Sequence, residues 1–143
     1  MDANVVFAAL IASGKTFELF VWNELNNRLE FVAPEYLSIE IRSNQEEVLV
    51  KSGLSKAEFE EVLRMIELQI DFIPADEFTD FLPKAKEISP TNDFPYVALS
   101  LYFKSRGYEV GIWSNDKGLK EAAEKQGITV FPSHLLLKRL GLV

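Results

Sequence analysis

The chain has no cysteine and a single histidine, His134, among its 143 residues. Without cysteine it cannot form a disulfide bond, a thiolate metal site or a thiol nucleophile. His134 follows Ser133 in a late segment, where a surface or capping role is the simplest interpretation. No patterned serine partner accompanies it, so the sequence indicates no nucleophilic triad.

Long apolar runs are also missing, since no stretch approaches eighteen consecutive apolar residues. The first residues lack the basic start and apolar run of a secretion signal. We therefore expect no membrane partner and a cytoplasmic location. Neither G-x-G-x-x-G nor G-x-x-x-x-G-K-[ST] occurs, which argues against a nucleotide-binding or phospho-acceptor α/β domain, an alternative that stays open.

An excess of positive charge is absent as well. The 15 basic and 22 acidic residues give a net charge of −7. This balance argues against a broad basic face that grips nucleic acid. It does not exclude an enzyme that holds phosphate locally through metal ions. A solvated surface that keeps the protein soluble explains most of the acids.

The order of apolar patterns predicts one α/β domain over residues 1–143 with a parallel sheet. Strands are expected over about 29–33, 72–74, 110–113 and 128–131. Helices are expected over about 5–13, 16–25, 34–52, 55–70, 94–106 and 117–126, with another that ends near 88 after a cap at Asp76 or Thr79, and a last one capped by Ser133. Ser55 and Glu58 match a capping box.

Four acids stand out by their position, three at the expected ends of regular elements and one within a helix. Asp93 precedes a helix and Asp116 follows a strand, at the edge where parallel sheets bind ligands. Asp2 begins the first helix, and Glu40 lies about two turns into its own helix. We expect these four side chains to converge in one cleft.

Crowded carboxylates repel one another unless a cation neutralises them. Oxygen ligands without cysteine or histidine favour Mg²⁺ or Mn²⁺. The alternatives are that Asp93 and Asp116 only cap helices, that Asp2 is a solvated terminal residue and that Glu40 is one of several surface acids. Phe17, Phe20, Trp22 and Phe31 suggest a base-stacking platform, but their spacing favours the core.

The motifs around these acids resemble the PIN domain family. The resemblance covers residues 1 to about 131, in the order and spacing of that family. Its segments are Asp2-Ala3-Asn4-Val5, then Pro34-Glu35-Tyr36-Leu37-Ser38-Ile39-Glu40-Ile41, then Asn92-Asp93-Phe94-Pro95-Tyr96-Val97-Ala98-Leu99, and finally Ile112-Trp113-Ser114-Asn115-Asp116-Lys117.

This resemblance implies a three-layer α/β/α fold with a central parallel sheet of about five strands. It also implies a Mg²⁺- or Mn²⁺-dependent ribonuclease, often the toxin of a toxin–antitoxin pair, that hydrolyses RNA without a covalent enzyme intermediate. Carried over by position, Asp2, Glu40, Asp93 and Asp116 would be the catalytic metal ligands. RNA, an antitoxin protein and a second copy of the chain are the expected partners.

Polar neighbours complete the predicted site. The resemblance implies that Asn4 and Ser114 orient the acids. Lys117 and Lys120 lie one turn apart beside Asp116 and are candidates for phosphate contacts, although a solvated helix face is the default for such lysines. Some family members carry an extra acid at the position where this chain has Lys117. The resemblance therefore leaves open whether a second metal ion binds.

Only Met1 precedes Asp2, whereas family members carry an apolar first strand there. Either the sequence as given starts late, or this first strand is truncated, replaced or absent. The rival from another functional class is a non-catalytic PIN-like module that binds RNA or protein, to which the acidic pI of about 4.8 gives weight.

Overall fold

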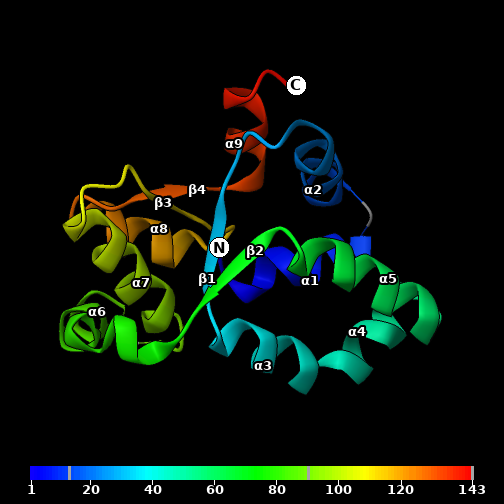
Figure 1. Cartoon of the computed structure of the whole chain (residues 1–143), viewed down its shortest axis with the longest axis horizontal. Coiled ribbons are helices and arrows are strands. Elements are labelled where there is room, and N and C mark those ends of the chain that lie inside the picture. Colours follow the sequence, from blue (N-terminus) through cyan, green and yellow to red (C-terminus); the bar gives the residue numbers. More distant parts are fainter. Residues whose placement is uncertain (13, 90, 143) are drawn as a thin grey trace.

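The computed structural model describes residues 1–12, 14–89 and 91–142, and these form an α/β fold (Figure 1). The strands are β1 (Phe31–Pro34), β2 (Ile70–Ile73), β3 (Gly111–Trp113) and β4 (Thr129–Phe131). The helices are α1 (Ala3–Ala12), α2 (Lys15–Asn26), α3 (Tyr36–Ser43), α4 (Gln45–Ser52), α5 (Lys56–Glu67), α6 (Leu82–Ile88), α7 (Phe94–Ser105), α8 (Lys117–Glu124) and α9 (Ser133–Arg139). Two single-turn 3₁₀ helices, η1 (Ala75–Glu77) and η2 (Thr79–Phe81), precede α6.

The strands pair in parallel, as predicted, but they do not form one sheet of about five strands. Phe31 of β1 lies opposite Ile70 of β2, and Gly111 of β3 lies opposite Thr129 of β4. Within the described ranges there are thus two separate two-stranded sheets. The expectation of a single larger sheet is wrong for this part of the chain.

The first described residues lie beside β3. The backbone N–H of Asp2 donates to the carbonyl of Trp113 at 3.1 Å, so the first residues lie along the edge of β3. Helix α1 then begins at Ala3.

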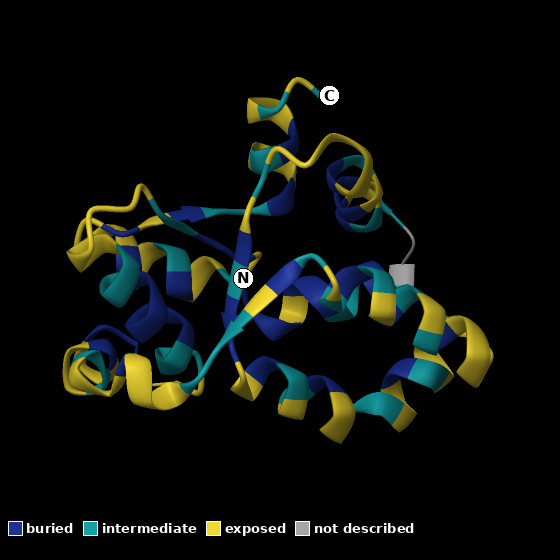
Figure 2. Cartoon of the chain, in the orientation of Figure 1, coloured by how far each residue is buried: buried dark blue, intermediate teal, exposed yellow. Residues whose placement is uncertain are grey.

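Helices α1 and α7 are the most buried helices (Figure 2). Their apolar residues belong to two core clusters. The first cluster includes Val5, Leu10, Leu19, Leu37, Leu63 and Trp113, and the second includes Ala85, Val97, Leu99, Ile112, Leu119 and Val130. Figure 1 shows α6, α7 and α8 on one side of β1 and β2, and α1, α3, α4 and α5 on the other.

The predicted base-stacking alternative fails for two of its aromatics. Phe20 and Phe31 pack against each other and against Trp113, with ring centroids 5.0–5.4 Å apart. Phe20 is fully buried and Phe31 nearly so. These rings therefore belong to the core, where burial of large aromatic groups contributes strongly to stability.

One long helix was expected over 34–52, but the chain forms two. Pro34 ends β1 instead of opening a helix, because the N–H of Glu35 continues the strand pairing with the carbonyl of Ile73 at 3.1 Å. Asn44 separates α3 from α4, and Gly53 ends α4 in the left-handed region at φ 70°. The following capping box of Ser55 and Glu58 is confirmed.

Three predicted capping residues do something else. Neither Asp76 nor Thr79 caps α6, which has Phe81 at its N-cap position. Thr79 instead donates its hydroxyl to the carbonyl of Ala75 at 2.9 Å. Ser133 is the first residue of α9 rather than its cap, and its buried hydroxyl serves a long-range contact.

Within the described residues, no single helix is long and apolar enough to cross a membrane; α1 and α2 reach that length and composition only as a bent pair. The predicted helix over 5–13 is otherwise confirmed by α1, and its last predicted residue, Ser13, lies outside the described residues.

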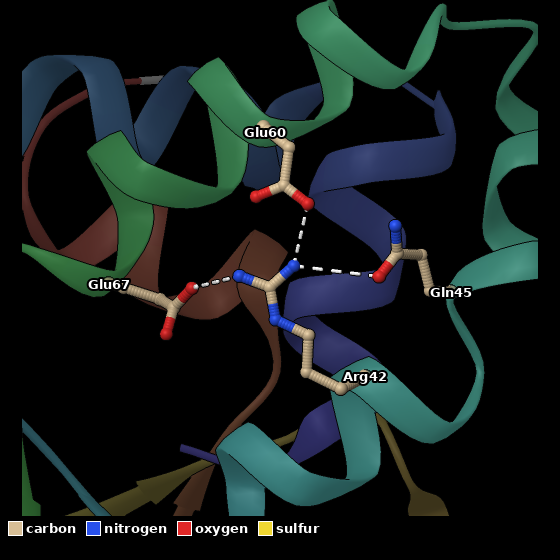
Figure 3. A network of polar contacts seen from close by, with 4 residues as sticks. All are labelled: Arg42, Gln45, Glu60 and Glu67. Atoms are coloured by element: carbon tan, nitrogen blue, oxygen red, sulfur yellow. Dashed lines mark hydrogen bonds and ion pairs between the residues drawn. The ribbon is translucent and has the colours of Figure 1, made fainter.

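A polar network joins α3 to α5 across the surface (Figure 3). The guanidinium of Arg42 donates to Glu60 Oε1 at 2.7 Å and to Gln45 Oε1 at 3.5 Å. It also lies 3.6 Å from Glu67 Oε1. The network connects the outer side of α3, the helix that carries Glu40, to α5.

Candidate functional site

Each of the four acids stands on a different element. Asp2 directly precedes α1, Glu40 lies in α3, Asp93 occupies the N-cap position of α7 and Asp116 that of α8. Helix α3 packs in the first core cluster and α8 in the second. The acids thus come from both halves of the core.

Asp2 is 1% exposed, although it is an aspartate at the start of a helix. Its Oδ1 accepts from the N–H of Val5 at 3.3 Å, and its Oδ2 accepts from the hydroxyl of Ser114. Burial raises its pKa, while the Ser114 hydrogen bond acts in the opposite direction. The interpretation of Asp2 as a plain solvated residue is therefore wrong.

The hydroxyl of Ser114 forms hydrogen bonds with two of the acids. Besides donating to Asp2, its Oγ accepts from the backbone N–H of Asp116 at 3.1 Å. Ser114 follows β3 directly and is completely buried. One hydroxyl thus contacts both the Asp2 side chain and the Asp116 backbone, and its orienting role stays a prediction.

Asp116 does cap a helix. Its Oδ1 accepts from the N–H of Leu119 at 3.1 Å, which satisfies one free donor in the first turn of α8. The capping alternative is thus confirmed for one oxygen of this residue. A carboxylate has further acceptor capacity on its second oxygen, so the cap and a metal ligand are compatible.

Asp93 behaves differently from Asp116. It occupies the N-cap position of α7, but its carboxylate makes no capping hydrogen bond to that helix. It accepts instead from the hydroxyl of Thr91 at 3.4 Å. Capping therefore does not account for the Asp93 carboxylate.

The electrostatic environment of Asp93 is the most perturbed of the four. Its pKa is raised to about 6, first by burial and then by the negative charges of Asp2, Asp116 and Glu40. The charge of Asp2 also raises the pKa of Glu40, after the larger effect of burial. Asp93 is therefore near enough to the other three carboxylates to be repelled by each, and Asp2 is near enough to repel Glu40.

The arrangement of the acids was compared with what a metal ion requires. Among the described residues, no group of three or more acidic or histidine side chains is arranged to hold a metal ion. The chemistry of the donors still fits Mg²⁺ or Mn²⁺, because all four are carboxylates and a dication would relieve the repulsion that raises the pKa of Asp93. The acids fit a hard cation by type and charge, and their oxygens do not converge on one point.

Glu40 has a partner that the sequence did not suggest. Its Oε1 accepts from the hydroxyl of Tyr96 at 2.6 Å, across from α7 to α3. A signal for this contact exists in the sequence: Tyr96 lies in a helix predicted to be buried on most sides, and a buried phenol needs a hydrogen-bond partner. Which acceptor it would find could not be read from local pattern.

The remaining residues predicted for the site are Asn4, Lys117 and Lys120. Asn4 is exposed, and in the part of the chain that the structure describes its side chain makes no hydrogen bond to the acids, so its orienting role stays a prediction. Lys120 pairs with Glu124 at 2.6 Å along α8. Lys117 is exposed at the start of α8, beside Asp116.

A cavity of about 530 Å³ lies away from these acids. It runs beside the amino ends of β1 and β3, and its lining includes Met1, Phe31, Tyr108 and Trp113. None of the four acids is among its described lining residues. This cavity therefore does not coincide with the four predicted metal ligands.

Comparison with known proteins agrees with the motifs. The family model described as PIN domain matches residues 1–128, which include all four acids and both orienting candidates. Neither the curated proteins nor the solved structures contain a significant match to the chain. PIN domains typically have a nuclease-type fold and activity. Since the match spans most of its 143 residues, the chain belongs to the PIN domain family.

Proposed function

We propose that this protein is a Mg²⁺- or Mn²⁺-dependent endoribonuclease that hydrolyses RNA phosphodiester bonds. The observation that carries the proposal is Asp93. Its half-buried carboxylate is not used as a helix cap, and its pKa is raised to about 6 by burial and by three carboxylates from other elements. Such a perturbed acid is a candidate for function rather than for stability.

The residues have separate roles in this proposal. Asp2, Glu40, Asp93 and Asp116 would hold the cations. Ser114 fixes the Asp2 side chain and the Asp116 backbone through its one hydroxyl. Lys117, exposed beside Asp116, would approach a phosphate of the RNA. When bound, divalent cations would activate water and neutralise charge on the phosphodiester.

The surface charge limits how RNA would be held. With a net charge of −7, long-range attraction of RNA to the protein is weak. Binding would then depend on cations at the acids and on local contacts. A toxin role, an antitoxin protein, a homodimer and a cytoplasmic location extend the proposal on the family resemblance alone.

The proposal is tested with labelled single-stranded RNA. We expect cleavage with Mn²⁺ or Mg²⁺, loss of cleavage with EDTA, and a loss of about 100-fold or more with Asp93→Asn. Asp80→Asn is a matched control, because Asp80 is an exposed aspartate in η2. Activity that survives EDTA or Asp93→Asn would count against this mechanism.

A second candidate function is a non-catalytic module that binds RNA or protein. It is favoured by the absence of a preformed metal geometry among the described acids, together with the capping role of Asp116. Calorimetric binding of Mn²⁺ without any cleavage of RNA would support this candidate over the nuclease.

A further inference from the structure

The hydrogen bond between Tyr96 and Glu40 connects two distant parts of the chain. The Tyr96 hydroxyl donates to Glu40 Oε1 at 2.6 Å, and the two residues are 56 positions apart. Tyr96 is 3% exposed and its ring belongs to the first core cluster, so it is held by packing. Glu40 is only half-buried.

The two partners differ in conformational freedom. A glutamate on a partly exposed helix face has three rotatable side-chain bonds and many available rotamers. The Tyr96 ring is fixed in the core and directs its hydroxyl to one point. A donor on a rigid side chain therefore restricts the carboxylate that it contacts more than a solvent molecule would.

The tyrosine is suited to act as a donor. Burial, followed by the hydrogen bond to Glu40, raises its pKa well above the ordinary value. In this contact the Tyr96 hydroxyl is the donor and Glu40 Oε1 is the acceptor, at 2.6 Å.

We infer that Tyr96 is a positioning residue for Glu40: its hydroxyl holds Oε1 and thereby orients the second carboxylate oxygen for the cation. This inference rests on the proposed function. In the part of the chain that the structure describes, the hydrogen bonds of the Glu40 carboxylate use Oε1, which leaves Oε2 available as a ligand. Residues that orient a metal ligand in this way typically change metal affinity 10–100-fold when they are removed.

The chain offers a matched pair for comparison. Tyr102 also lies on α7, and its hydroxyl donates to Glu77 Oε2 at 3.4 Å. That contact is longer and exposed, and Glu77 is not one of the four acids. The substitution to phenylalanine removes the same single oxygen in both cases.

A purely structural role of Tyr96 would have different consequences. If Tyr96 only packs between α3 and α7, loss of its hydroxyl lowers the thermal midpoint and leaves metal affinity unchanged. If it positions Glu40, metal affinity falls by more than any loss of stability explains. Mn²⁺ binding to the folded protein, measured without RNA, separates these roles.

The experiment is a calorimetric titration of Mn²⁺ into the wild-type protein, Tyr96→Phe and Tyr102→Phe, with the thermal midpoint of each. We expect the Kd for Mn²⁺ to rise about 10-fold in Tyr96→Phe and to stay unchanged in Tyr102→Phe. In a Glu40→Gln background, Tyr96→Phe should cause no further loss, because the ligand that it orients has been altered.

Two results overturn the inference in distinguishable ways. If wild-type protein binds Mn²⁺ and Tyr96→Phe binds it equally well, Tyr96 does not position a ligand, and the proposed function stands. If wild-type protein binds no Mn²⁺ at millimolar concentration, the metal-dependent function fails, and the role of Tyr96 fails with it.

Discussion

Asp93 is the acid among the predicted metal ligands whose pKa is raised to about 6, first by burial and then by neighbouring carboxylates. In the unfolded chain its pKa is expected at the ordinary 3.8, and in the folded protein it is about 6. The folded state therefore retains the proton to a higher pH than the unfolded state. Stability then decreases as pH rises between these two values, because the folded state binds more protons there.

The first prediction concerns this pH dependence in metal-free protein. The contribution of Asp93 to the free energy of unfolding is most favourable below about pH 4 and is lost by about pH 6. Asp93→Asn should remove this loss and stabilise the metal-free protein at pH 8 by about 1 kcal/mol, a value discounted for the half-exposed side chain. Urea unfolding from pH 4 to pH 8 measures it.

The control for this prediction is the exposed Asp80→Asn, which should leave the pH profile unchanged within error. A metal-free Asp93→Asn protein that is less stable than wild type at pH 8 would show that Asp93 is favourably paired. That result would contradict the repulsion between acids described above.

Individual residue roles were predictable only where the partner is close in sequence. The role of Asp116 as the N-cap of α8 could be predicted, because its partner, the N–H of Leu119, is only three positions away. Ser133 was expected to cap in the same way, but it accepts from Trp113 Nε1 at 2.9 Å and from Thr16 Oγ1 at 3.1 Å. Those partners are 20 and 117 positions away, and no local pattern encodes them.

Helix α3 carries Glu40, and the network of Arg42 fixes its outer side to α5. The pair of Arg42 with Glu60 has side chains 45% and 42% exposed, so solvent screens it strongly. Exposed ion pairs of this kind contribute little, although a network with three acceptors contributes more than an isolated pair. The effect on stability should be small and sensitive to salt.

The second prediction follows from that network. Arg42→Ala should lower the free energy of unfolding by about 0.5–1 kcal/mol at low salt, and by less at 1 M NaCl. Lys51→Ala breaks a single pair with Glu47 within α4 and should cost less. Urea unfolding at two salt concentrations measures both, and equal losses from both variants would show that no network exists.

The third prediction concerns the start of α5. Ser55 Oγ accepts from the N–H of Glu58, and Glu58 Oε1 accepts from the N–H of Ser55, both at 3.1 Å. Ser55→Ala should lower the free energy of unfolding by about 1 kcal/mol. Ser105→Ala, at the exposed end of α7, is the control and should change it by less than about 0.5 kcal/mol.

Elements with strong local signals were predicted well. The capping box and the apolar spacing of Phe59, Leu63 and Ile66 define α5. Pro34 was assigned to the wrong element because its tolerance in a first helical turn is equally consistent with the end of an edge strand. The break at Asn44 was missed because the apolar pattern continues through it.

Across the whole molecule, the two sheets are joined by side chains rather than by strand pairing. Phe20 lies 5.4 Å from Phe31 of β1 and 5.0 Å from Trp113 of β3, measured between ring centroids. Helix α7 also packs on both strands. The relative position of α3 and β3, and so of Glu40 and Asp116, depends on this shared core.

The fourth prediction tests that dependence. Phe20→Ala should lower the free energy of unfolding by about 3–5 kcal/mol, because it leaves a cavity between the two sheets. Phe17→Ala removes a partly buried ring from the same helix and should cost less. Guanidinium unfolding followed by tryptophan fluorescence measures both, and a smaller loss for Phe20 than for Phe17 would contradict this view of the core.

The α/β class and the family could be predicted from sequence, but the sheet could not. Parallel strands and alternating helices follow from local apolar patterns. Whether β1 and β3 join one sheet depends on what lies between them, and here Asp2 contacts β3 while α1 begins at the next residue. Asp93 and Asp116 lie at the starts of α7 and α8, and Glu40 lies within α3, as the local patterns predicted. The distances between the acids depend on packing between elements, which those patterns do not encode.

The measurement that tests the central claim most directly is the effect of Mn²⁺ on the stability of wild-type protein and of Asp93→Asn at pH 8. If the four acids share a cation, Mn²⁺ at 100 times its Kd raises the free energy of unfolding of the wild type by about 2.7 kcal/mol. The same Mn²⁺ concentration should stabilise Asp93→Asn far less. Equal stabilisation of both proteins, or of neither, would contradict the account.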